Sequence, residues 1–270
     1  MKPSDFKLSR RSFLQASTAA GTLLSASYAP PAFAQSKSVP LNEYKPEYLS
    51  PDEWQFILAA TARLIPSDGK GPGAIEARVP VFIDRQLAGS FGNAADWYME
   101  GPHDITAPAQ LGYQSPLTPA EVYRAGIAEL NQWCTDTHGN VFALLDAKTQ
   151  DTVLGQLESG DIKLVSTKSA SLFDLLLQNT KEGYFADPMY GGNAEMTAWK
   201  YIGFPGARAS FREWAGIEKP YPLGPVSISG KRVNHGETGK EKRRRHYWPG
   251  LDRVDPWHGI VQYGTGGSGP

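Results

Sequence analysis

The sequence predicts a mainly α, compact helical domain with long irregular loops, followed by an extended Pro/Gly-rich C-terminal arm. Apolar residues recur at helical spacing behind capping signals, whereas no long segment alternates apolar and polar residues as a strand would. The 270 residues include 28 glycines and 21 prolines, which predict long irregular connections. A hydrophobic share of 40% and a charged share of 20% are typical of a globular protein with a sizeable core.

Two helix starts carry the clearest signals. Ser50 and Thr118 are each followed by a proline and, three residues on, by a glutamate. This pattern is typical of an N-cap with proline in the first helical turn and a capping box. One further segment, 225–233, allows a short hairpin. The predicted helices cover residues 50–66, 79–91, 118–139, 147–158 and 169–180.

Residues 1–34 have the features of an export signal, so the chain divides into this signal, a helical domain over 35–214 and the arm over 215–270. A basic start and a mildly apolar run precede a small-x-small cleavage site that ends at Ala34, before Gln35. "SRRSFLQ" at 9–15 matches the twin-arginine signal. Its targeting residues are Arg10, Arg11, Phe13 and Leu14.

The signal predicts the twin-arginine translocase as a partner during export and a periplasmic location for the chain from residue 35 onward. An ordinary secretory signal that carries two arginines is the alternative. Because the twin-arginine route moves folded proteins, it suits cargo that acquires a cofactor or a partner before export.

Charge and cysteine content exclude several classes. The net charge is −1, and four basic residues against one acid in the signal leave about −4 for the remainder, which argues against nucleic-acid binding. A basic run at 231–246 has the composition of a solvated loop; an acidic partner or a lipid headgroup is the alternative. Cys134 is the single cysteine, so neither an intramolecular disulfide nor a C-x-x-C-H haem attachment can form.

Candidates for catalysis are few. Cys134 and His138 lie four residues apart on a predicted helix, but no second ligand pair accompanies them, so a half-buried cysteine and a capping histidine are favoured over a zinc site. Asp187 and Glu195 are a conceivable acid/base pair. No Rossmann fingerprint and no G-x-S-x-G appears.

The densest stretch is "EGYFADPMYGGNAEMTAWKYIGFPGA", residues 182–207, called the signature region below. Asp187 and Pro188 predict a turn, Gly191 and Gly192 allow unusual backbone angles, and Asn193 is expected to cap a short helix that runs through Trp199. We expect a rigid loop whose aromatic rings present flat surface for a protein contact. These rings belong to Tyr184, Phe185, Tyr190, Trp199, Tyr201 and Phe204.

The signature region resembles that of the gluconate 2-dehydrogenase subunit 3 family, and the export signal and the early "W…ILAATARLIPSD" helix at 54–68 support the resemblance. The resemblance implies a non-catalytic small subunit without a cofactor of its own. Its partner would be a large FAD-bearing dehydrogenase of the glucose–methanol–choline type, which the small subunit helps to mature and escorts during export. In three-subunit complexes of this family, a multi-haem cytochrome c subunit passes electrons to membrane quinone.

The resemblance places partner-interface and scaffold positions in the signature region. These are Asp187, Pro188, Tyr190, Gly191, Gly192, Asn193, Trp199, Gly203, Phe204, Pro205 and Gly206. A different class of function is a stand-alone periplasmic carbohydrate-binding protein that stacks Tyr190, Trp199 and Trp248 on sugar rings. An enzyme that uses Asp187 or Glu195 by itself is the third alternative.

Overall fold

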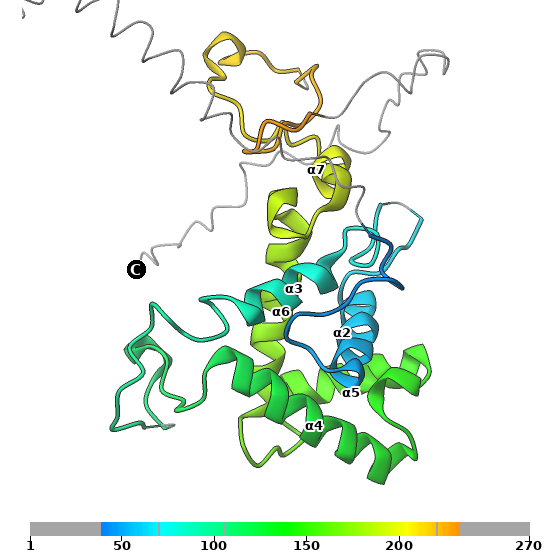
Figure 1. The fold of residues 1–270 in the computed structure, drawn as a ribbon, viewed down its shortest axis with the longest axis vertical. Coiled ribbons are helices and arrows are strands. Elements are labelled where there is room, and N and C mark those ends of the chain that lie inside the picture. Colours follow the sequence, from blue (N-terminus) through cyan, green and yellow to red (C-terminus); the bar gives the residue numbers. More distant parts are fainter. Residues whose placement is uncertain (1–38, 70, 105, 220, 233–270) are drawn as a thin grey trace, which may run out of the picture.

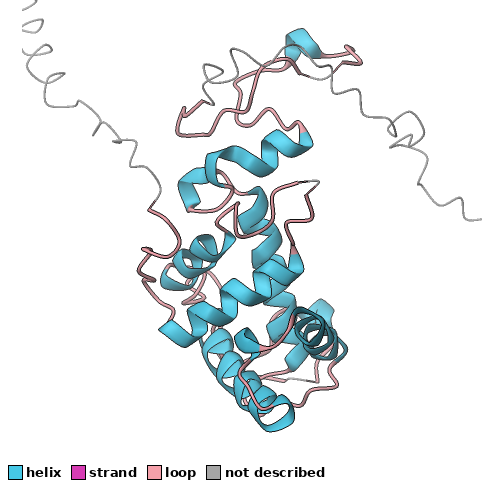
Figure 2. Cartoon of the chain, turned by 90° about the vertical axis from the view of Figure 1, so that its right-hand side faces the viewer, coloured by secondary structure: helices cyan, strands magenta, loops and turns pink. Residues whose placement is uncertain are grey.

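The computed structural model describes residues 39–69, 71–104, 106–219 and 221–232 (Figure 1). Within these ranges the chain forms helices, turns and isolated β-bridges but no strand, which confirms the predicted mainly α class (Figure 2). The predicted targeting residues, the cleavage site at Ala34–Gln35, Trp248 and most of the basic run lie outside the described residues. None of the described helices is both long enough and apolar enough to span a bilayer.

The helical body begins with α2 and ends with α6. The α-helices are α2 (Pro51–Leu64), α3 (Val79–Ala88), α4 (Pro119–His138), α5 (Ala147–Ser159), α6 (Ser169–Phe185) and α7 (Thr197–Ile202). The 3-10 turns are η1 (Ala109–Leu111), η2 (Phe142–Leu144), η3 (Pro188–Tyr190), η4 (Ala194–Met196) and η5 (Arg212–Trp214).

Both predicted capping boxes are present. The Glu53 N–H donates to the Ser50 hydroxyl over 3.3 Å, and the Ser50 N–H donates to the Glu53 carboxylate over 2.7 Å. Thr118 and Glu121 make the same pair of bonds at 3.3 and 2.8 Å. Each box satisfies backbone donors that the first helical turn leaves without a partner.

Two helix ends differ from the prediction. Helix α3 ends at Ala88, three residues before the expected end, and the chain leaves the helix at Gly89. Helix α6 continues to Phe185, so Gly183 lies inside the helix rather than in the loop. A Cβ at Gly183 would lie 2.8 Å from the ring of Phe82, which shows that the glycine permits close packing of α6 against α3 and does not break the helix.

Helix α6 lies at the centre of the body and packs against α2, α3, α4 and α5. Phe56 and Phe142 pack against each other in the same hydrophobic core, with ring centroids 4.9 Å apart and the rings tilted by 51°. Helix α7 and the chain that follows it lie at one end of the body, beyond the C-terminal end of α6 (Figures 1 and 2). The signature region therefore joins the body to the C-terminal segment.

Asp84 attaches the N-terminal segment to this body. Its carboxylate is fully buried on α3 and accepts hydrogen bonds from the Tyr44 hydroxyl at 2.8 Å and from the N–H groups of Glu47, Tyr48 and Leu49 at 2.7, 3.0 and 3.0 Å. Burial and the bond to Asp84 raise the pKa of Tyr44, so its hydroxyl keeps the donated proton over the physiological range.

Replacing Asp84 by alanine is expected to lower the free energy of unfolding by about 3 kcal/mol, because four donors lose a charged acceptor. Urea unfolding followed by circular dichroism measures this loss. Asp151→Ala is the matched control, since it removes only the exposed ion pair with Arg63 and should leave the midpoint nearly unchanged. Equal midpoints for the two variants would contradict the role of Asp84.

Candidate functional site

The signature region begins in the last turn of α6 and continues through η3, η4 and α7. In Figure 1 it forms the connection between the helical body and residues 207–232. Packing against the helical body on one side and against residues 207–232 on the other therefore positions the residues of this region.

Asp187 is the polar centre of the region and is 6% exposed. Its Oδ1 accepts the Met189 N–H at 3.1 Å and the Ser227 hydroxyl at 2.6 Å, and its Oδ2 accepts the Ile228 N–H at 2.7 Å. The predicted turn at Asp187 and Pro188 is present as η3. One carboxylate thus fixes both this turn and a segment that lies 40 residues further along the chain.

That segment, residues 225–232, is called the C-terminal clasp below. The Val226 N–H donates to the Pro205 carbonyl at 3.2 Å, and the Val226 carbonyl accepts the Ala207 N–H at 2.6 Å. Lys231 forms an ion pair with Glu195 at 2.8 Å. Val226 also bridges Arg232 in antiparallel fashion, at the position where the sequence allowed a hairpin. This part of the predicted arm therefore packs on its own chain.

Close backbone contact shapes the middle of the region. Gly191 has a φ of +100°, and a Cβ at Gly192 would lie 2.1 Å from the Gly183 carbonyl oxygen, so the loop crosses α6 at van der Waals distance. Asn193, Glu195 and Met196 then take φ values of 43°, 53° and 55°. Such left-handed angles cost non-glycine residues about 1 kcal/mol each. The surrounding contacts must offset this strain.

Asn193 supplies part of that compensation. It is fully buried, its side-chain amide donates to the Ala186 carbonyl at 2.9 Å, and its Oδ1 accepts the Ala198 N–H at 3.0 Å. Asn193 therefore satisfies a donor in the first turn of α7, as a capping residue would. The start of the helix differs from the expected one, since α7 begins at Thr197 and not directly after Asn193, and it ends at Ile202, before Gly203.

The aromatic residues divide into two groups. Tyr184 and Trp199 are each 6% exposed, so the expectation that all the rings present surface is wrong for these two. The Tyr184 hydroxyl donates to the Pro72 carbonyl at 2.6 Å, and the Trp199 Nε1 donates to the Phe185 carbonyl at 2.8 Å. These two backbone carbonyls thus satisfy the Tyr184 hydroxyl and the Trp199 indole N–H, which allows both side chains to be buried. Trp199 is buried and cannot stack on a sugar ring.

The remaining rings are accessible: Phe185, Tyr190, Tyr201 and Phe204 are 40–47% exposed. Among the other interface and scaffold positions, Gly206 is buried. A Cβ there would lie 2.2 Å from the Val226 carbonyl oxygen, so the clasp passes directly against this glycine. Gly203 ends α7 with a φ of +72° and is exposed. Pro188, Gly191 and Pro205 are half-buried. The region thus combines a packed interior with an exposed aromatic side.

The catalytic candidates do not form a constellation. Asp187 is buried on its three donors, whereas Glu195 is exposed and pairs with Lys231. Cys134 is fully buried, and burial raises the pKa of its thiol to about 11. His138 is exposed and lies edge-on to Trp133, with ring centroids 5.5 Å apart. In the described ranges no three His, Cys, Asp or Glu side chains gather in a way that suits a metal ion.

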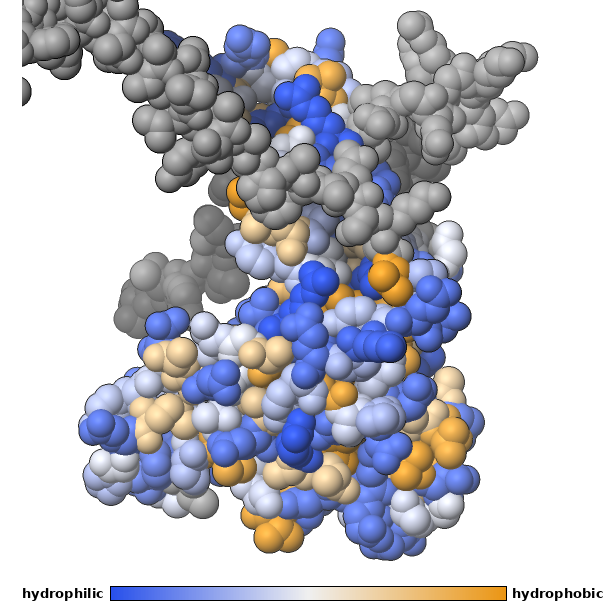
Figure 3. Space-filling model, viewed as in Figure 1, coloured by the Kyte–Doolittle hydropathy of each residue, from blue (hydrophilic) through white to orange (hydrophobic). Residues whose placement is uncertain are grey.

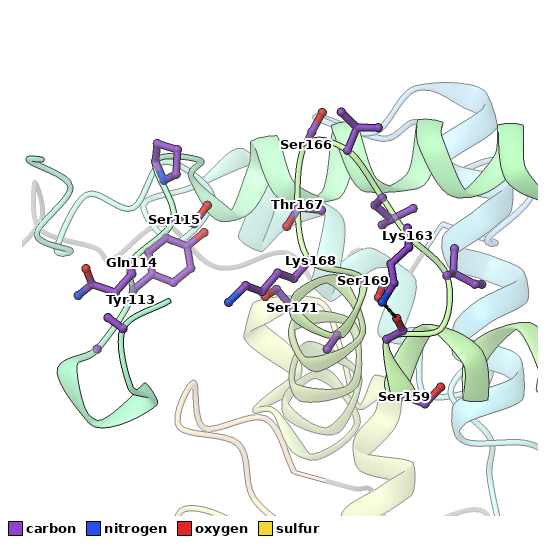
Figure 4. Close-up of a pocket in the computed structure, with 18 residues that line it drawn as sticks. Tyr113, Gln114, Ser115, Ser159, Lys163, Ser166, Thr167, Lys168, Ser169 and Ser171 are labelled. Carbon is purple, nitrogen blue, oxygen red and sulfur yellow. Dashed lines mark hydrogen bonds between the residues drawn. The ribbon is translucent and has the colours of Figure 1, made fainter. Parts of the chain in front are cut away.

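A cavity of about 700 Å³ lies between the loop around Tyr113 and the start of α6 (Figure 4). Hydroxyl and lysine side chains share the lining of this cavity with apolar residues, and Lys163 donates to the Gly160 carbonyl at 2.6 Å (Figure 4). The described lining residues include no histidine, cysteine or carboxylate, so they offer no ordinary general base. No motif in the sequence indicated this cavity.

The contact between Asp187 and Ser227 also had no signal in the sequence. Ser227 lies in a Pro/Gly-rich segment without helical periodicity, and nothing local connects it to a residue 40 positions earlier.

The fold and this region define an all-α protein in which an aromatic loop is packed between the helical body and a C-terminal clasp. The gluconate 2-dehydrogenase subunit 3 family model matches residues 51–206, more than half of the chain, and the chain belongs to this family. No curated protein and no solved structure matched the chain. The matched range ends at Gly206, so the clasp lies beyond it.

Proposed function

We propose that this chain is the non-catalytic small subunit of a periplasmic FAD-dependent dehydrogenase complex. The membership of a family described as a dehydrogenase subunit carries the proposal. The catalytic partner is a flavoprotein of the glucose–methanol–choline type that oxidises a sugar or a sugar acid. The FAD belongs to that large subunit and not to this chain.

The small subunit also carries the export signal for the complex. The twin-arginine motif at Arg10 and Arg11 supports this step, since the route accepts folded cargo. The flavoprotein acquires FAD in the cytoplasm, binds the small subunit and travels with it to the periplasm. Where a multi-haem cytochrome c subunit completes the complex, that subunit places it at the membrane.

Purification of the C-terminally tagged chain from the native host tests the proposal. We expect a large partner with flavin absorbance in the periplasmic or membrane fraction, and dye reduction by the complex when a suitable sugar acid is added. Haem absorbance bands would reveal the cytochrome subunit. A colourless chain that elutes alone would contradict the proposal and would favour the carbohydrate-binding alternative, which binding of sugars to the lone chain then tests.

A further inference from the structure

Exposed apolar side chains gather at the end of the body that the signature region forms. Phe185, Tyr201, Ile202 and Phe204 are 46%, 40%, 55% and 44% exposed. They are called the apolar end face below. On the side of the helical body visible in Figure 3, by contrast, apolar residues are scattered among polar ones. Soluble proteins rarely leave a connected apolar patch uncovered unless it binds something.

Buried aromatic residues connect these side chains. The Phe204 ring packs edge-on against Trp199 at 5.1 Å between ring centroids, and Trp199 in turn donates to the Phe185 carbonyl. Phe185 packs against Tyr184 at 5.0 Å. A Cβ at Gly71 would lie 2.7 Å from the Tyr201 ring, so this ring rests on the loop before α3. Phe185, Tyr201 and Phe204 are therefore each supported from beneath, by a buried aromatic ring or by the loop before α3.

The residues that support the face are themselves buried and hydrogen-bonded. Trp199, Tyr184 and Asn193 are buried and each makes a hydrogen bond to a backbone group. A face that is ordered before binding loses less entropy on association than a flexible loop would.

The segment beside the face is basic. Residues 206–232 contain five basic residues and two acidic ones, namely Arg208, Arg212, Lys219, Lys231 and Arg232 against Glu213 and Glu218. Lys231 pairs with Glu195 outside this segment, so the other four basic residues carry the excess over the two acids. The segment also exposes Phe211, Leu223 and Ile228. A symmetric contact between two copies of this chain would bring these like charges together, which disfavours self-association. The chemistry fits a partner with an apolar patch and an acidic rim.

We propose that the flavin-bearing dehydrogenase subunit docks on the apolar end face, with acidic residues of that subunit against the basic segment. This inference rests on the proposed function, and it assigns the contact to one end of the molecule. Helix α7 lies at the centre of the contact, and the C-terminal clasp forms its flank.

Charge substitutions on α7 test the inference in the full, tagged chain expressed in the native host. Ile202→Glu combined with Phe204→Glu should reduce co-purified flavin per chain at least tenfold. In the complex, these two positions would then bury carboxylates in place of apolar side chains, and the carboxylates would face the acidic rim of the partner. Leu144→Glu combined with Val165→Glu is the matched control. These residues are 71% and 94% exposed on η2 and on the loop before α6, and their substitution should leave the flavin content unchanged.

Each outcome separates the inference from the proposed function. Unchanged flavin content in the α7 variant would overturn the docking face while the wild-type complex stands. Absence of flavin from the wild-type preparation would overturn both. A wild-type dimer that the α7 substitutions convert to a monomer would identify a second copy as the occupant and overturn the inference. Binding of the wild-type chain alone to anionic phospholipid vesicles, lost in the α7 variant, would overturn the inference as well.

A second measurement does not depend on the stability of the variant. Hydrogen exchange in the wild-type chain, free and in complex with the flavoprotein, should show slower exchange at the amides of residues 199–206 in the complex. Equal rates at these amides in the two states would overturn the inference.

Discussion

Replacing Arg10 and Arg11 by lysine is expected to leave both this chain and its flavin-bearing partner in the cytoplasm. The receptor of the twin-arginine route reads the arginine pair itself. An ordinary secretory signal needs only a basic start, which the two lysines preserve. The substitution therefore separates the two alternatives for residues 1–34. Dehydrogenase activity measured in the periplasmic fraction should fall at least tenfold, with the folded flavoprotein recovered from the cytoplasm.

Lys2→Arg combined with Lys7→Arg is the control, because it exchanges basic residues outside the motif and should leave export intact. Two results would contradict the hypothesis in different ways. Export of both proteins in the Arg10→Lys, Arg11→Lys variant would identify an ordinary secretory signal. Export of the flavoprotein without this chain would show that the partner carries its own signal and needs no escort.

Gly192→Ala is expected to destabilise the chain by about 3 kcal/mol, a large value for a single methyl group. The new Cβ would lie 2.1 Å from the Gly183 carbonyl oxygen and 2.9 Å from its carbon, both of which are backbone atoms of α6. No side-chain rotation relieves this contact, so the loop must move away from the helix. Because Asn193 follows directly, its bonds to Ala186 and Ala198 would be strained as well.

Thermal unfolding followed by circular dichroism measures this effect, and the flavin content of the purified complex reports whether the docking face is retained. Gly155→Ala is the matched control, since no atom outside the neighbouring backbone of α5 itself lies within 4 Å of its added Cβ. There alanine should be neutral or stabilising, because it favours the helix over glycine by about 1 kcal/mol. A melting temperature of Gly192→Ala equal to that of the wild type would contradict the close crossing of loop and helix.

The elements that local signals define could be predicted from the sequence. The capping boxes at Ser50 and Thr118 each join residues three positions apart, so the local sequence alone is enough to predict them. The end of α6 could not be predicted in this way. From the local sequence, Gly183 predicts the start of a loop. The reason for the glycine lies in a distant part of the chain, because the ring of Phe82 leaves no room for a side chain at that position of α6.

The interior of the candidate site depends on still more distant partners. The Tyr184 hydroxyl finds its acceptor 112 residues earlier, at Pro72, and Asp187 finds Ser227 40 residues later. Composition indicated the aromatic and turn character of the signature region correctly. It could not separate the rings that support the surface from those that form it, because burial is decided by the packing of α3, α6 and the clasp together.

The bond between Asp187 and Ser227 also sets an order in time. At a synthesis rate of about 5–20 residues per second, the 40 residues that separate them take about 2–8 s to make. Through that interval the helices of the body are already complete in sequence, while the Asp187 carboxylate still lacks two of its three donors. In the proposed complex, the flavoprotein would thus meet a finished docking face only after the C-terminal clasp has been made.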